Sequence, residues 1–210
     1  FDLPGHGLSP AVTEPFTVED LADALIDLAD SLGINSFCYA GVSLGGAIGL
    51  TLALKYPKRV KVVLPICSAP KFGDTDSWIT RAQAVRENGT AQFAEGTKDR
   101  WFSKRFQERK PELVDQTLQM LCSVDRESYA LGCEALASYD ITSELQEISV
   151  PVMVVAGELD PVVPYASALK YSQQLGAGSI IEVLGVAHQA VLEAPEVLAK
   201  HINYSVRQNK

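Results

Sequence analysis

The sequence predicts an α/β fold, in which a mostly parallel sheet is flanked by helices. Short apolar runs alternate with helical patterns along most of the chain, and one long polar segment interrupts the alternation. Strands that alternate with helices form right-handed βαβ units, and the strands of such units run parallel. The strands are expected at residues 36–42, 60–66, 152–156 and 180–184.

Helical periodicity marks the segments between and around these strands. Residues 17–32 carry apolar side chains at helical spacing, with acidic residues in the first turn and Gly33 as a stop. Further helices are expected over residues 47–56, 165–175 and 195–206.

The polar segment at residues 71–140 is expected to form a helical cap inserted between two strands. It is charged, helical in pattern, and contains both tryptophans, Trp78 and Trp101. Open α/β sheets bind ligands beyond the carboxyl ends of their strands, so an insertion there would cover a site. We therefore expect a core of residues 1–70 and 141–210 and a cap of residues 71–140.

Composition narrows the classes of function. The chain has 210 residues, of which 47% are hydrophobic and 21% are charged, and its formal net charge is −8. This charge argues against nucleic acid, whose phosphates are bound by Lys and Arg. No apolar run is long enough for a membrane span, so no membrane partner is expected. The sequence does not indicate the oligomeric state.

The four cysteines, at positions 38, 67, 122 and 133, show no Cys-x-x-Cys spacing. We expect reduced, mostly buried thiols in a cytoplasmic protein, with no metal site and no disulfide framework.

Residues 41–46, with the sequence Gly-Val-Ser-Leu-Gly-Gly, are the most informative about function. They join an expected strand to an expected helix, and Gly-x-Ser-x-Gly at such a junction is typical of a nucleophile elbow. In this turn the glycines let strand and helix approach, because a Cβ there would clash. The pentapeptide alone is a weak signal, since a glycine turn whose serine caps a helix has the same pattern.

Later strand ends supply the partners that a nucleophilic serine needs, a base and an acid that orients it. Asp160 follows the strand at 152–156, and His188 follows the strand at 180–184 through a short loop. Because each strand end delivers one required group, we expect Ser43, Asp160 and His188 to form a catalytic triad.

The neighbouring candidates are expected to have structural roles. Glu158 is interpreted as a solvent-facing turn residue, His6 as a loop residue, and His201 as a solvated helix residue. Asp160 lies too far upstream of the helix at Tyr165 to be its N-cap.

The chain resembles the α/β-hydrolase superfamily along its whole length, and the order serine, acid, histidine is that of the superfamily. Residues 2–9, Asp-Leu-Pro-Gly-His-Gly-Leu-Ser, look like the loop before its first long helix. Motifs in the expected cap are similar to those of 3-oxoadipate enol-lactonases: Trp78, Arg81, Val85, Arg86 and Gly89, then Arg100, Trp101, Phe102 and Phe106, then Tyr129 and Cys133.

The resemblance implies hydrolysis of the lactone ring of 3-oxoadipate enol-lactone in aromatic catabolism, with no cofactor or metal. Ser43 would attack the carbonyl, His188 would take its proton, and Asp160 would hold the imidazole. The backbone N–H of Leu44, where the family often has methionine, would donate to the oxyanion.

The substrate of that family carries a carboxylate, which an arginine can bind through two parallel hydrogen bonds. Arg81, Arg86 and Arg100 are the candidates, and Trp101 is expected to line the pocket.

The resemblance also implies strands ahead of residues 2–9, one of which carries the second oxyanion donor. We therefore expect the sequence to be a fragment, N-terminally incomplete, with weak activity or poor folding.

Other functions stay open on the sequence. A carboxylesterase or carbon–carbon bond hydrolase would use the same triad, and a binding module or impaired fragment would use none of it. A haloalkane dehalogenase is disfavoured, because its nucleophile is an aspartate where this chain has Ser43.

Overall fold

The computed structural model describes residues 1–209 and divides into two compact units. The cap unit comprises Phe1–Thr17 and Phe72–Tyr139, and the core unit comprises Val18–Lys71 and Asp140–Lys210. The division differs from the expected one at the N-terminus, because residues 1–17 belong with the cap helices. The N–H of Asp125 donates to the Gly5 carbonyl at 3.4 Å, and the Val12 N–H donates to Ser128 Oγ at 3.0 Å.

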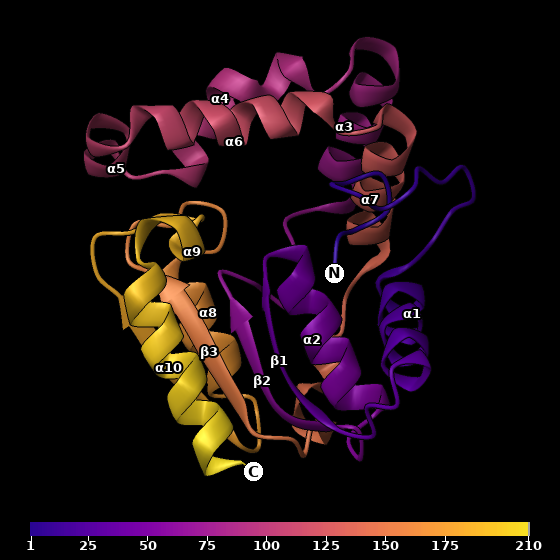
Figure 1. Ribbon diagram of the computed structural model, residues 1–210, viewed down its shortest axis with the longest axis vertical. Coiled ribbons are helices and arrows are strands. Elements are labelled where there is room, and N and C mark those ends of the chain that lie inside the picture. The colour runs from indigo at the N-terminus through magenta and orange to yellow at the C-terminus, as the bar shows by residue number, and fades with distance from the viewer. Residues whose placement is uncertain (210) are drawn as a thin grey trace. The chain divides into compact units, whose positions relative to one another are not determined.

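The core unit contains a parallel sheet of four strands in the order β1-β2-β3-β4, which confirms the predicted α/β fold (Figure 1). Val42 pairs with Ile66, and Ile66 pairs with Val155, so the carboxyl ends of neighbouring strands lie at one edge. The strands are β1 (Phe37–Val42), β2 (Val60–Ile66), β3 (Val152–Gly157) and β4 (Gly178–Val183).

Helices cover both faces of this sheet. Gly49, in the helix that follows β1, lies close to Val63 of β2, because a Cβ on Gly49 would lie 2.9 Å from Val63 Cγ1. Ile66 of β2 belongs instead to an apolar cluster with Leu198, which lies in the C-terminal helix. Val63 and Ile66 point to opposite faces, because side chains alternate along a strand. The helices of the core unit are α1 (Val18–Ser31), α2 (Leu44–Lys55), α8 (Tyr165–Ser172), α9 (Ala190–Glu193) and α10 (Pro195–Gln208), with a 3₁₀ turn at Thr142–Glu147.

The cap unit is helical, as the sequence predicts. Asp74 and Asp125 begin two of its helices by accepting hydrogen bonds from the backbone N–H groups of Ser77 and Ser128. The helices are α3 (Thr75–Asn88), α4 (Ala94–Trp101), α5 (Lys104–Arg109), α6 (Pro111–Ser123) and α7 (Arg126–Ser138), with a 3₁₀ turn at Ala91–Phe93.

The predicted element boundaries agree with the structure to within a few residues. The helix expected at 165–175 ends at Ser172, and the strand expected at 180–184 runs over Gly178–Val183. The helix α9 was not predicted, because a single turn is too short to show helical periodicity.

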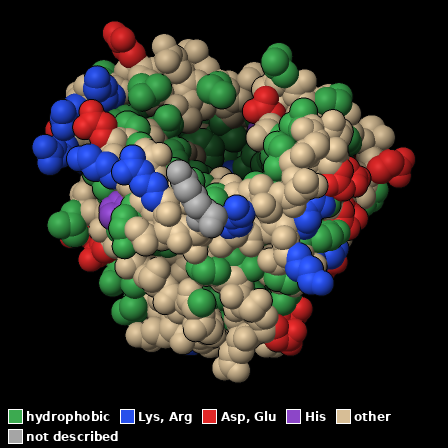
Figure 2. All heavy atoms as spheres, turned by 60° about the horizontal axis from the view of Figure 1, so that its bottom comes forward, with side chains coloured by type: hydrophobic (Ala, Val, Ile, Leu, Met, Phe, Trp, Pro, Cys, Tyr) green, Lys and Arg blue, Asp and Glu red, His purple; other side chains and the backbone are tan. Residues whose placement is uncertain are grey.

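The helices, the surface and the cysteines give three further observations. Within residues 1–209, no helix is both long enough and apolar enough to cross a bilayer. On the face that Figure 2 shows, hydrophobic side chains are dispersed among charged and uncharged polar ones, as is usual for a protein surface. All four cysteines are free thiols, and Cys67 and Cys133 are buried.

The junction of β1 and α2 needs glycine at two of its three glycine positions. A Cβ on Gly41 would lie 2.4 Å from the backbone of Gly45, and one on Gly46 would lie 2.4 Å from Ser68 Cβ. A Cβ on Gly45 would meet only Tyr39 Oη, at 3.9 Å. The expectation that both glycines flanking x-Ser-x exclude a Cβ is therefore correct for Gly41 and wrong for Gly45.

We expect Gly41→Ala to lower the free energy of unfolding by about 1–3 kcal/mol, because a backbone group must move to admit the methyl. Gly45→Ala is the matched control within the same motif, and it should be neutral or stabilising by up to about 1 kcal/mol, since alanine favours a helix. Urea unfolding measures both, and equal losses in the two variants would contradict this account.

Candidate active site

Ser43 occupies a strained turn between β1 and α2. Its φ of 52° lies in the left-handed region, and Cys67 is the other described non-glycine residue with a positive φ. Such a conformation costs free energy and persists where surrounding contacts enforce it. The Ser43 side chain makes no cap hydrogen bond to α2, so its hydroxyl is not engaged by the helix.

Backbone and side-chain hydrogen bonds from two strands hold this turn. The Ser43 N–H donates to the Ile66 carbonyl at 2.9 Å. The Ser68 hydroxyl donates to the Ser43 carbonyl at 2.7 Å, and the Tyr39 hydroxyl donates to the Gly45 carbonyl at 3.0 Å. Burial raises the pKa of Tyr39, so this hydroxyl keeps the proton that it donates.

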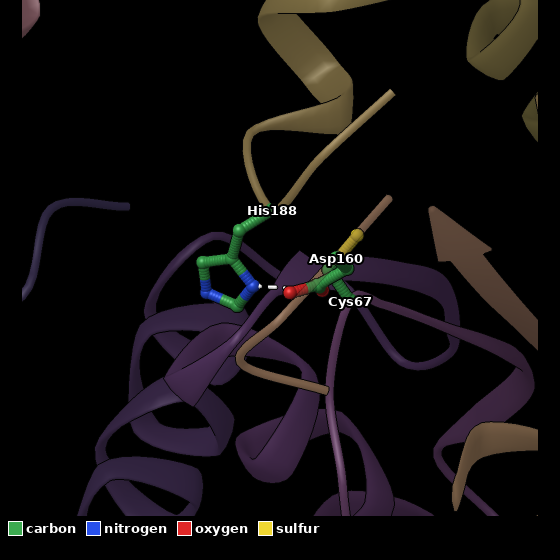
Figure 3. A group of neighbouring side chains, drawn as sticks. All are labelled: Cys67, Asp160 and His188. Atoms are coloured by element: carbon green, nitrogen blue, oxygen red, sulfur yellow. Dashed lines mark hydrogen bonds and ion pairs between the residues drawn. The ribbon is translucent and has the colours of Figure 1, made fainter. Parts of the chain in front are cut away.

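Asp160 lies in the loop after β3, and its side chain is buried and fully engaged. One carboxylate oxygen, Oδ1, accepts from the backbone N–H groups of Val162 and Val163 at 2.8 and 3.1 Å. The other, Oδ2, lies 2.9 Å from Nδ1 of His188 (Figure 3). A buried carboxylate needs such partners, because its desolvation is costly.

His188 lies in the loop after β4 and is 3% exposed. Its loop is fixed to the Asp160 loop, since the Leu159 N–H donates to the Val186 carbonyl at 2.9 Å and the Gly185 N–H donates to Glu158 Oε2 at 2.7 Å. Glu158 is thus exposed, as expected, but its carboxylate also joins the two loops. The hydrogen bond to Asp160 fixes the His188 ring and leaves Nε2 for proton transfer.

Ser43 follows β1, Asp160 follows β3 and His188 follows β4, and Asp160 and His188 are hydrogen-bonded. Within the described chain, no hydrogen bond joins the Ser43 hydroxyl to His188. In enzymes without substrate this contact is often long and tightens when substrate binds.

The Leu44 N–H lies in the first turn of α2, where backbone N–H groups have no partner within the helix and the helix dipole favours negative charge. This N–H is therefore suited to donate a hydrogen bond to an oxyanion.

Cys67 lies beside the Asp160–His188 pair (Figure 3). Ligand-type atoms of the three residues lie within 4.8 Å of one another, so the group has the composition of a metal site. Burial, together with the negative charge of Asp160, raises the pKa of the Cys67 thiol to about 12. Metals bind the thiolate, and Asp160 and His188 already bond each other, so the chemistry favours a hydrogen-bonded pair beside a neutral thiol.

Sequence reasoning missed Cys67 and Ser68, which directly follow β2. The available signal is their position, since a polar candidate follows each of the strands expected at 36–42, 152–156 and 180–184. Neither residue belongs to a recognisable motif.

The three candidate arginines differ in their partners. Arg86 forms ion pairs with Glu127 and Glu134, which raise its pKa further and commit it to the cap structure. Arg100 is exposed at the end of α4.

Arg81 is half-buried and has no ion pair with a carboxylate of the described residues. Its Nε and Nη2 donate to the Tyr129 hydroxyl at 3.1 and 2.8 Å, and its guanidinium lies 4.3 Å from the Phe93 ring centroid. Trp101 is half-buried at the end of α4.

The remaining histidines lie outside the group of Ser43, Asp160 and His188. The Nδ1 of His6 lies 2.9 Å from the Pro4 carbonyl in the N-terminal loop. His201 lies on α10, where it is half-buried.

Known proteins place this chain in a family. The sequence profile of the alpha/beta hydrolase family matches residues 1–201. The chain is 37% identical to 3-oxoadipate enol-lactonase 2 of Acinetobacter baylyi, over 93% of this chain and 73% of that protein. It is 33% identical to 3-oxoadipate enol-lactonase 1 of the same organism, with the same shares covered.

A solved structure agrees with the sequence matches. The enol-lactonase from Burkholderia xenovorans LB400 superposes with a TM-score of 0.94 at 28% identity, over 98% of this chain and 79% of that one. The chain therefore belongs to the alpha/beta hydrolase family and is a hydrolase of carboxylic ester or lactone bonds.

Proposed function

We propose that the protein opens the lactone ring of 3-oxoadipate enol-lactone, as a step of aromatic catabolism. The observation that carries the proposal is the strained Ser43 turn at the same sheet edge as the buried, hydrogen-bonded Asp160–His188 pair. Similarity to two 3-oxoadipate enol-lactonases supports the choice of substrate. The proposal includes a cytoplasmic location, which only the cysteine pattern supports.

The first half of the reaction forms an acyl-enzyme. Ser43 Oγ attacks the lactone carbonyl carbon while His188 Nε2 takes the hydroxyl proton, and Asp160 stabilises the resulting imidazolium. The tetrahedral oxyanion accepts a hydrogen bond from the Leu44 N–H. Collapse breaks the ring C–O bond, and the leaving oxygen takes the proton from His188 to become an enol, which tautomerises to the ketone.

The second half releases the product. His188 takes a proton from water, whose oxygen attacks the acyl carbon, and collapse of the second tetrahedral intermediate breaks the bond to Ser43. Ser43 Oγ recovers its proton from His188, and the acid leaves. The residues return to their starting protonation states, and no electron transfer is involved.

Arg81 is the best candidate of the three arginines for the substrate carboxylate. Arg86 is occupied by two glutamates and Arg100 is exposed, whereas Arg81 is half-buried with no carboxylate partner among the described residues. Its stacking on Phe93 holds the planar guanidinium, which suits two-point recognition of a carboxylate. Trp101 is also proposed to contact the substrate, through its rigid apolar side chain.

The same residues would serve a carboxylesterase or a carbon–carbon bond hydrolase, so substrate preference is the discriminating measurement. A lactonase should show a much higher kcat/KM on enol-lactone than on p-nitrophenyl acetate. The reverse order would favour the esterase.

Ser43→Ala should lower kcat for lactone hydrolysis by about 10⁴-fold or more, and Asp160→Asn by about 10⁴-fold, because nucleophile and oriented base act as a unit. A fluorophosphonate probe, read by intact mass and peptide mapping, should label Ser43 in the folded protein. Failure to label a folded sample, or activity retained in Ser43→Ala, would refute serine catalysis at this position.

Arg81→Gln should raise KM for the enol-lactone by about tenfold, because the lactone carries a carboxylate that Arg81 would bind. Hydrolysis of p-nitrophenyl acetate, which has no carboxylate, should stay within about twofold of wild type. Arg100→Gln is the matched control and should change neither. Tyr129→Phe removes the hydrogen-bond partner but keeps the guanidinium, so it reports the structural share of any effect. Equal loss on both substrates in Arg81→Gln would exclude carboxylate binding.

A further inference from the structure

We propose that Ser68 is a positioning residue that holds the peptide group between Ser43 and Leu44 in the orientation an oxyanion requires. This inference rests on the proposed serine chemistry at Ser43. It assigns a task to a residue outside the triad, at the end of β2.

Ser68 is built into the elbow from the neighbouring strand. It is 1% exposed, and its hydroxyl donates to the Ser43 carbonyl at 2.7 Å. A Cβ on Gly46 would lie 2.4 Å from Ser68 Cβ and 2.5 Å from its Oγ, so the side chain packs directly on the first turn of α2. The close fit leaves the hydroxyl little freedom to turn away.

Peptide planarity links this hydrogen bond to the oxyanion donor. The Ser43 carbonyl and the Leu44 N–H belong to one trans peptide group and point in opposite directions. A bond that fixes the carbonyl therefore also fixes the N–H. It polarises the amide as well, which makes the N–H a stronger donor.

Helical hydrogen bonds supply part of the restraint on the Ser43–Leu44 peptide group, and the Ser68 hydroxyl adds a side-chain hydrogen bond to the same group from outside the helix. The Ser43 carbonyl also accepts from the N–H groups of Gly46 and Ala47 at 2.9 and 3.1 Å, which are bonds of the first helical turn. The Ser43 φ of 52° is unfavourable, so the turn would relax unless tertiary contacts opposed it. Among side chains, the Ser68 hydroxyl makes such a contact at the peptide group between Ser43 and Leu44.

The test compares Ser68→Ala with wild type and with Ser172→Ala in the full chain. Ser172 is a matched control, because it is also buried and its hydroxyl donates to a helix carbonyl, that of Leu169, at 2.8 Å. Ser68→Ala should lower kcat by about tenfold with KM within about twofold, since the donor acts on the transition state. Ser172→Ala should keep both constants within about twofold of wild type.

A second readout separates positioning from general damage. A trifluoromethyl ketone forms a tetrahedral oxyanion on the serine, so its affinity should fall by the same factor of about ten in Ser68→Ala. Folded Ser68→Ala with wild-type kcat and ketone affinity would overturn the inference.

If Ser68→Ala does not fold, Ser68→Cys keeps the size and offers only a weak donor. A folded Ser68→Cys should show the same loss of kcat and ketone affinity, and wild-type values would overturn the inference. Ser43→Ala distinguishes failure of the proposed function from failure of the inference about Ser68. Activity retained in Ser43→Ala would refute the proposed function. An inactive Ser43→Ala beside a fully active Ser68→Ala would refute only the role of Ser68.

Discussion

The parallel register of β1, β2 and β3 is the constraint on which the site depends. Because Val42 pairs with Ile66 and Ile66 with Val155, the chain leaves neighbouring strands at one edge of the sheet. Residues distant in sequence therefore meet just beyond the strand ends. A shift of register would turn these side chains to other faces and separate the groups.

Burial of Asp160 makes the arrangement demanding. The carboxylate has left water, so its stability depends on the two backbone N–H groups and on His188. These partners sit on loops that are themselves joined, and a Cβ on Gly157 would lie 2.6 Å from the Ala187 carbonyl. The pairing of Asp160 with His188 thus depends on the close approach of the two loops that carry them.

Strand ends could be predicted from the sequence because apolar runs and glycine turns are local signals, and Ser43, Asp160 and His188 follow from them. Ser68 and Cys67 could not, since a small polar residue after a strand carries no pattern of its own. The grouping of residues 1–17 with the cap helices was also hidden, because it depends on contacts such as Val12 to Ser128 that span much of the chain. Tertiary contacts of this kind leave no periodicity.

The elbow shows why its pentapeptide is a weak predictor by itself. Of the two glycines that define it, only Gly41 is required by the local packing. The third glycine, Gly46, is required by the side chain of Ser68, which follows β2. Hydrogen bonds from the Tyr39 and Ser68 hydroxyls, which come from β1 and from the end of β2, oppose relaxation of the strained φ of Ser43. The sheet therefore maintains the turn, and a matching pentapeptide without these neighbours would be free to relax into an ordinary helix cap.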